Sequence, residues 1–235
     1  MNRRIQELAL LAALTGCAAP PPAPPQAPPA APDQADWYRQ AQAAGKTVLP
    51  IDSASSLITV VVRRGGPLAR MGHDHVVASR HISGMVAPGE GRADFGFRLD
   101  QLSVDEPALR QQAGLTTTPD SDAIAGTREN MLKRVLQADQ FPLVHMHVEA
   151  IDASHVRLAI TLHGVTRSMV QSVLRTDSGD SVSASGTLTL LQSDFGITPM
   201  SVMGGAMVVL DPMELQFQIR ARRAPPAPHP SSTRP

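Results

Sequence analysis

Two pairs of histidines are the residues of this chain best suited to chemistry. His73 and His75 flank Asp74, and His145 and His147 are also separated by one residue. In an extended segment such positions share a face, so that two imidazoles and a nearby carboxylate could bind one metal ion. One hypothesis is therefore a metal-binding protein or a metal-dependent enzyme that uses the segment from His73 to His75.

The alternation of residues 143–148 argues against a site that combines the two pairs. His145 and His147 alternate with apolar residues, which places both imidazoles on the face away from the apolar interior. For His73 and His75 the competing interpretation is a tight turn whose side chains cap backbone groups. We favour no metal site, and His73 and His75 are the candidates that the sequence offers for one.

Other catalytic patterns are missing from the sequence. It has no Gly-x-Ser-x-Gly elbow, no phosphate-binding glycine loop and no nucleotide fingerprint. A formal net charge of zero and an aromatic content of 3% also disfavour a nucleic-acid partner. Support in the sequence for an enzyme that works without a metal is therefore thin, so we name no catalytic residues and expect no cofactor.

The single cysteine, Cys17, follows a basic start and a short apolar segment at residues 8–14 that cannot span a bilayer. The order Leu14-Thr15-Gly16-Cys17 resembles the lipobox of bacterial lipoproteins. This resemblance implies that residues 1–16 are a signal peptide and that Cys17 is lipidated, whereas the alternative is a cytoplasmic amino terminus with a buried cysteine. We expect a periplasmic protein attached to a membrane through Cys17. Ala18 favours the outer membrane over the inner one.

Composition divides the rest of the chain. Residues 17–46 form a tether rich in Pro and Ala, stiff in its polyproline part, with a short helix expected at 36–45. A folded domain is expected over residues 47–222 and a disordered, Pro-rich tail over 223–235.

Period-two alternation predicts a domain that is mainly β. One helix is inserted at residues 127–137, where apolar residues recur at helical spacing, and residues 105–125 read as an extended loop. About eight strands are expected, at 56–63, 82–87, 94–99, 141–148, 156–163, 169–175, 183–191 and 214–220. With little helix to cover the sheet, closure into an antiparallel β-barrel is the natural way to bury its apolar face.

Several short motifs resemble one known family. Their order is Ile51-Asp52 to Leu57, a helix before Phe141-Pro142, His163-Gly164-Val165-Thr166-Arg167, and Ser193-Asp194-Phe195-Gly196-Ile197. Shared order and spacing over residues 47–222 make the chain similar to the YceI-like family of periplasmic lipid-binding proteins. The resemblance implies a lipocalin-like barrel that binds a polyisoprenoid or another long-chain amphiphile without catalysis. It also implies that Gly164 forms a turn that a side chain would obstruct.

The resemblance implies a cavity lined by apolar side chains that point into the barrel. A solid core made of the same residues is the alternative that the sequence leaves open. From the phase of each strand and of the helix, the candidates for contact with the ligand are Leu57, Val61, Phe95, Phe97, Leu99, Met131, Leu132, Val144, Met146, Leu158 and Ile160.

Overall fold

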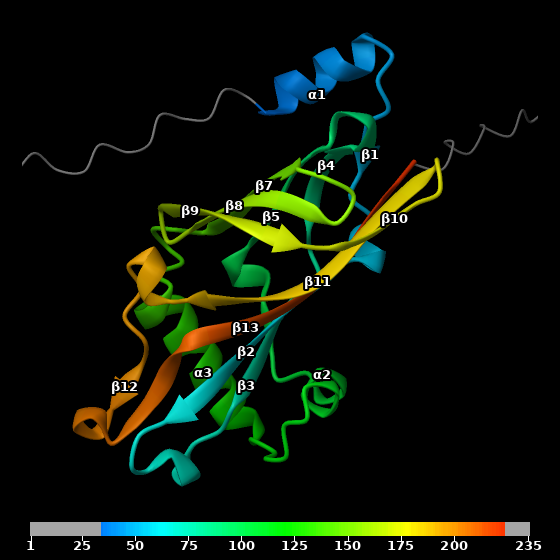
Figure 1. Ribbon diagram of the computed structural model, residues 1–235. Coiled ribbons are helices and arrows are strands. Elements are labelled where there is room, and N and C mark those ends of the chain that lie inside the picture. Colours follow the sequence, from blue (N-terminus) through cyan, green and yellow to red (C-terminus); the bar gives the residue numbers. More distant parts are fainter. Residues whose placement is uncertain (1–33, 224–235) are drawn as a thin grey trace, which may run out of the picture. The chain divides into compact units, whose positions relative to one another are not determined.

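The computed structural model describes residues 34–223, so the predicted signal peptide, Cys17, most of the tether and nearly all of the tail lie outside the described residues. Residues 34–223 form thirteen strands in two antiparallel sheets (Figure 1). In spatial order, sheet A contains β1 (Leu49–Pro50), β4 (Ser83–Ala87), β5 (Arg92–Arg98), β7 (Leu143–Ala150), β8 (His155–Leu162) and β9 (Val165–Ser172). Sheet B contains β10 (Leu174–Asp177), β11 (Ser181–Leu191), β13 (Met207–Arg222), β2 (Leu57–Gly65), β3 (His75–Ser79) and β6 (Ser103–Val104), and β12 (Ser201–Val202) pairs with β13.

The inner face of each sheet carries apolar rows that run across neighbouring strands. In sheet A, Phe95 is paired with Met146, and Met146 with Ile160. In sheet B the corresponding row is Val77, Val60, Leu215 and Leu188. Successive side chains of a strand alternate between its faces, so these rows follow from the period-two pattern. Both sets of rows belong to one hydrophobic cluster.

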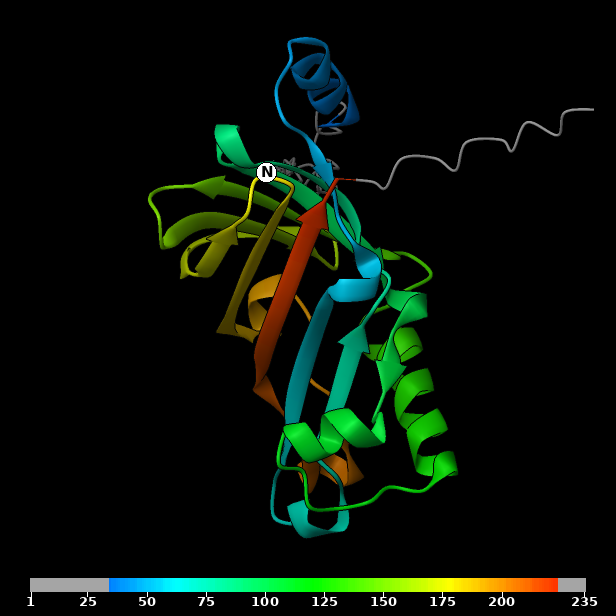
Figure 2. The same ribbon diagram turned by 90° about the vertical axis from the view of Figure 1, so that its right-hand side faces the viewer.

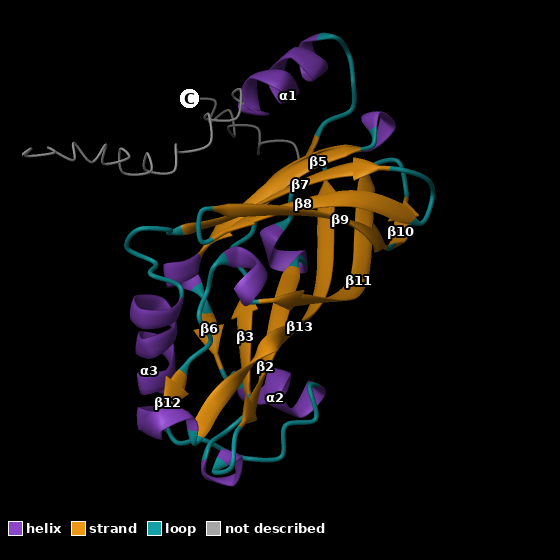
Figure 3. Ribbon diagram, turned by 60° about the vertical axis from the view of Figure 1, so that its left-hand side comes forward, coloured by secondary structure: helices purple, strands orange, loops and turns teal. Residues whose placement is uncertain are grey.

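The two sheets face each other with their strands running in different directions. Figure 3 shows β5, β7, β8 and β9 passing across the line of β13, β2 and β3. An isolated bridge between Ile51 and Ala221 links the two sheets at one edge. The prediction of a mainly antiparallel, lipocalin-like fold is confirmed, but the strands are divided between two sheets and are not hydrogen-bonded all the way round.

Helix α3 (Ser121–Asn130) starts earlier than the predicted helix. Its N-cap is Asp120, whose carboxylate accepts a hydrogen bond from the amide of Ala123 at 2.8 Å. The helix continues into a π-helical turn, η5 (Met131–Val135), whose apolar side chains pack on the main hydrophobic cluster. The first turns of α3 are polar and show no apolar periodicity. The sequence pattern therefore predicted only the end of α3 and the turn η5 that follows it.

Helix α2 (Pro107–Gln112) lies within the segment predicted to be a loop, and that prediction was wrong for these residues. Leu109 packs with Val61, Val76 and Ala78 on the outer face of sheet B. Figure 2 shows α2 in green in front of β2 and β3. One apolar anchor in six residues gives no helical periodicity, so the sequence did not reveal this helix.

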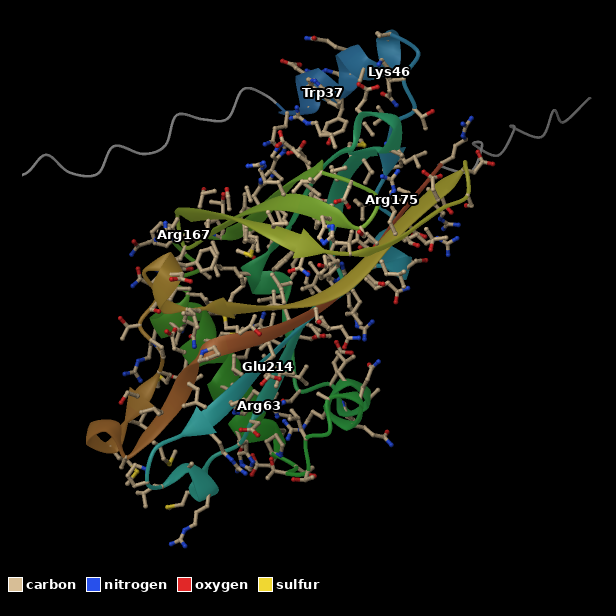
Figure 4. The ribbon with its side chains drawn as sticks, in the orientation of Figure 1. Trp37, Lys46, Arg63, Arg167, Arg175 and Glu214 are labelled. Atoms are coloured by element: carbon tan, nitrogen blue, oxygen red, sulfur yellow. The ribbon has the colours of Figure 1, made fainter. Side chains whose placement is uncertain are left out.

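Helix α1 (Gln34–Ala43) packs on the outer face of sheet A, near the position of the helix predicted at 36–45. Tyr38 is 4% exposed, and its hydroxyl donates to Asp94 Oδ2 at 2.8 Å. The guanidinium of Arg92 lies 4.3 Å from the centre of the Trp37 ring, and Figure 4 shows Trp37 between α1 and the sheet. The helix therefore belongs to the folded unit.

Six 3-10 turns complete the described elements: η1 (Ser53–Ser55), η2 (Ala69–Met71), η3 (Pro88–Glu90), η4 (Leu99–Gln101), η6 (Ser193–Phe195) and η7 (Met203–Gly205). Between residues 34 and 223, no helix has both the length and the apolar character needed to cross a membrane.

A two-residue turn, His163-Gly164, connects β8 to β9. Its φ angles are 52° at His163 and 73° at Gly164, as a type I′ hairpin requires. A Cβ at Gly164 would lie 2.8 Å from Cε1 of Phe141. The expectation that a side chain would obstruct this turn is therefore confirmed.

We predict that Gly164→Ala destabilises the protein by about 1–3 kcal/mol, because a left-handed residue with a side chain is strained and the Phe141 ring must also move. Urea unfolding would measure the change. Gly89→Ala is the matched control, because a Cβ at Gly89 meets nothing within 4 Å. Equal stability of the two variants would contradict the prediction.

Candidate binding cavity

A cavity of about 400 Å³ lies between the two sheets, and α3 with η5 provides part of its wall. Most of its lining side chains are apolar. The volume is in the range of pockets that hold small organic ligands. The space between the sheets is therefore not completely filled by side chains, as a solid core would require.

Eight of the eleven predicted contact residues line this cavity. They are Phe95, Phe97, Leu99, Met131, Val144, Met146, Leu158 and Ile160. Leu132 packs against the hydrophobic cluster without lining the cavity. Contact of these residues with a ligand stays a prediction.

The other two candidates, Leu57 and Val61, point the opposite way. They pack with Leu109 of α2 on the outer face of sheet B, whereas Ile58 and Val60 line the cavity. Residues 57–62 are apolar on both faces, so alternation could not fix the phase of this strand. The hidden helix α2 is the reason why the outer face is apolar as well.

Sequence reasoning also missed the cavity wall formed by β13 and β11. The alternation of apolar and polar residues from Met213 to Ile219 was the signal that could have found it. The apolar members of this stretch are Met213, Leu215, Phe217 and Ile219, and all four line the cavity.

The cavity is elongated along β13. Lining residues of this strand run from Val209 to Ala221, on both sides of the irregular register between Val209 and Met213. His75 is paired with Val62, which pairs with Met213, and this places His75 near the Val209 end. Arg175 is paired with Ala184, which pairs with Ile219, and this places it near the Ala221 end. The two polar ends are joined by an apolar middle.

At the first end, His75 belongs to a buried hydrogen-bond network. Its Nδ1 lies 2.6 Å from Oδ2 of Asp105, a carboxylate with no exposed surface. The guanidinium of Arg110 and the amide of Val76 donate to the other oxygen of the same carboxylate. Burial alone would raise the pKa of Asp105, but the hydrogen bonds from His75, Val76 and Arg110 outweigh it and lower that pKa.

The structure does not support the metal-site hypothesis for His73, Asp74 and His75. The rings of His73 and His75 have centres 6.2 Å apart, and β3 begins only at His75, so the shared-face argument does not apply. The Asp74 carboxylate accepts instead from the amide of Arg64 at 2.9 Å. Among residues 34–223, no three His, Cys, Asp or Glu side chains gather as metal ligands would.

The outward orientation predicted for His145 and His147 is confirmed. His147 Nδ1 lies 2.6 Å from Oδ1 of Asp94, whose other oxygen accepts from Tyr38 and Arg92. Burial would raise the pKa of Asp94, but these hydrogen bonds outweigh it and lower that pKa. The cluster joins α1 to sheet A and lies on the face away from the cavity.

The described fold and its cavity agree with the comparison to known families. A YceI-like domain model matches residues 51–221, which is more than half of the chain. The chain belongs to the YceI-like family. No curated protein matches this YceI-like chain.

Two solved structures share the YceI-like fold. One is a polyisoprenoid binding domain from Saccharophagus degradans implicated in plant cell wall breakdown, with a TM-score of 0.53 and 11% identity over 76% of this chain and 99% of that one. The other is BcnA from Burkholderia cenocepacia, with a TM-score of 0.51 and 15% identity over 73% of this chain and 99% of that one. At these identities the likeness concerns the fold alone.

We predict that His145 makes the stability of this YceI-like domain depend on pH. Burial lowers the pKa of His145, so the folded state binds a proton more weakly than the unfolded chain does. The stability is therefore complete above the unfolded pKa of about 6.5 and is lost as the pH falls through the lower, folded value. Urea unfolding at about pH 7.5 and about pH 5.5 should show a smaller loss for His145→Gln than for the wild type.

The exposed His81 provides the control for this measurement, as His81→Gln. The control variant should lose as much stability as the wild type over the same pH interval. An identical loss in the wild type and in His145→Gln would contradict the assignment to His145.

Proposed function

We propose that this YceI-like protein binds a polyisoprenoid or another long-chain amphiphile in its cavity and carries it without chemical change. The observation that carries the proposal is the elongated apolar cavity between the two sheets. Each methylene moved from water into such a space contributes roughly 0.8 kcal/mol, so a long chain can bind with few polar contacts. The polyisoprenoid-binding domain of the same fold supports this ligand class.

The composition of the lining supports a binding role over catalysis. Of the described residues that line the cavity, the ionisable ones are His75, Arg92 and Arg175, and none is a carboxylic acid. The guanidinium of Arg92 is on the outer face of sheet A, where it contacts Asp94 and Trp37. The Nδ1 atom of His75 is engaged by Asp105, and Arg175 lies toward the other end of the cavity. Acid and base groups that act on one substrate must both lie within hydrogen-bonding distance of it.

The place of action that we propose is the cell envelope. On this proposal, residues 1–16 direct export and lipidated Cys17 holds the protein on a membrane facing the periplasm. The part of the tether that precedes α1 connects this anchor to the folded domain. The outer membrane is the preferred location because Ala18 follows the cysteine. Lipid attachment would keep the cavity close to the bilayer that supplies or receives its ligand.

We predict that Val148→Trp reduces ligand binding, because Val148 lines the cavity and an indole would occupy the space of the hydrocarbon chain. Native mass spectrometry of the full chain should show a long-chain species on the wild type and little on the variant. Val170→Trp is the matched control in the same sheet, on a side chain that is 64% exposed. Wild-type protein that is always empty, or equal loading of both tryptophan variants, would contradict the proposal.

We also predict that Cys17→Ser moves the protein from the membrane fraction to the soluble periplasmic fraction, because the anchoring thiol is lost. Cell fractionation with immunoblotting would measure the distribution. Ala19→Ser leaves the cysteine intact and should stay with the membrane. Retention of Cys17→Ser in the membrane fraction would show that the anchor is elsewhere.

A further inference from the structure

We propose that the His75 end of the cavity is a subsite for a hydroxyl group, so that the ligand is a long-chain alcohol. The subsite consists of His75, Thr127 and Asn130, and we call it the hydroxyl subsite. The proposal rests on the proposed function, because it assigns the polar end of the amphiphile that the cavity would bind.

The Asp105 carboxylate fixes the proton on the His75 ring. Asp105 is ionised, since hydrogen bonds lower its pKa, and an ionised carboxylate can only accept hydrogen bonds. At 2.6 Å the Nδ1 of His75 must therefore be the donor. In the neutral ring this leaves Nε2 as an acceptor at the cavity wall, and the group that binds there must bring a hydrogen.

The protein itself satisfies this acceptor only weakly. The nearest recorded contact of Nε2 is Thr127 Oγ1 at 3.5 Å, well beyond the usual length of a hydrogen bond. Asn130 lines the same cavity one helical turn further along α3. Its Oδ1 accepts from Arg134 at 3.4 Å, so its NH₂ group is the part that remains to donate to a ligand. A hydroxyl group can donate a hydrogen bond to Nε2 of His75 and accept one from the NH₂ group of Asn130, so it matches both.

The charges around the subsite favour a neutral head group over an anionic one. Asp105 and Arg110 are side chains of opposite charge that contact each other and are both almost completely buried. Arg110 is further engaged by the backbone carbonyls of Asp74 and Thr117. The charges of Asp105 and Arg110 offset each other, so neither side chain offers an unpaired charge to a carboxylate or a phosphate, and an uncompensated buried charge is costly.

The subsite is held by four elements that differ in sequence position. His75 begins β3, Asp105 directly follows β6, Arg110 belongs to α2, and Thr127 lies in α3. Asp105 has a φ of 57°, an uncommon conformation for a residue with a side chain. The strained backbone turns the Asp105 carboxylate under His75, so the imidazole is oriented before a ligand arrives.

The test compares three ligands that share one chain: farnesol, farnesyl methyl ether and farnesoic acid. Each displaces the fluorescent probe N-phenyl-1-naphthylamine from the full-length protein at about pH 7.5, and the readout is the ratio of dissociation constants for ether and alcohol. The wild type should prefer farnesol to the ether by about tenfold, the value expected for one or two net hydrogen bonds.

His75→Asn is the decisive variant. The asparagine NH₂ can occupy the position of Nδ1 and keep its hydrogen bond to Asp105, while the cavity-facing Nε2 is removed. The preference for farnesol should fall to about one, with the probe still bound. His81→Asn, at an exposed histidine, should keep the preference, and Thr127→Val offers a second variant that lowers it without changing the buried ion pair.

Three other outcomes would each contradict a different part of the proposal. Equal displacement by farnesol and its ether in the wild type would overturn the hydroxyl subsite and leave the carrier function standing. Tighter binding of farnesoic acid than of farnesol would overturn the neutral head group in favour of an anionic one. If neither the probe nor any farnesyl compound bound, the proposed function itself would fail.

Discussion

The constraint on which this structure depends is that two antiparallel sheets must bury their apolar faces against each other while their strands run in different directions. Side chains in rows such as Phe95, Met146 and Ile160 stand on one sheet and meet rows of the other. A space remains between the two sheets that these rows line but do not fill. The cavity is thus a consequence of the sheet geometry. Its lining is apolar because the inward-facing side chains of the strands are apolar.

A contact between histidine and aspartate occurs at two places in the fold, one on the outer face of sheet A and one at the end of the cavity. Under α1, His147 contacts Asp94; beside α2, His75 contacts Asp105; both Nδ1 to carboxylate distances are 2.6 Å. In each case further groups donate hydrogen bonds to the second oxygen of the carboxylate, so the buried charge is balanced and hydrogen-bonded. The two differ in where the imidazole faces, because only His75 lines the cavity. Away from these clusters, exposed pairs such as Arg63 and Glu214 (Figure 4) connect adjacent strands at about 3 Å and contribute little to stability.

Much of the fold could be predicted because alternation is a local signal. Strands β4, β5, β7 and β8 and most of the eight cavity residues follow from period-two patterns, and the hairpin follows from Gly164, whose position requires positive φ. The strand predicted at 169–175 was wrong in its bounds, because β9 ends at Ser172 and β10 begins at Leu174. Residues 57–62 mark the limit, because a strand that is apolar on both faces has no readable phase, and only the position of α2 explains its outer side. The network of His75, Asp105 and Arg110 could not be predicted from a local pattern either. Its members are separated by up to 35 positions and meet only through the pairing of β3 with β6 and the placement of α2.

The docking of α1 on sheet A determines where a pulling force on the preceding chain would act. Residue 34 begins this helix, so tension along the chain that precedes it reaches the fold first at α1 and at the bond between Tyr38 and Asp94. That bond lies on the outside of the sheet, and the inner rows are carried by the strands themselves. Detachment of the helix would therefore expose Asp94 and His147 to water, while the strands that line the cavity would stay in place.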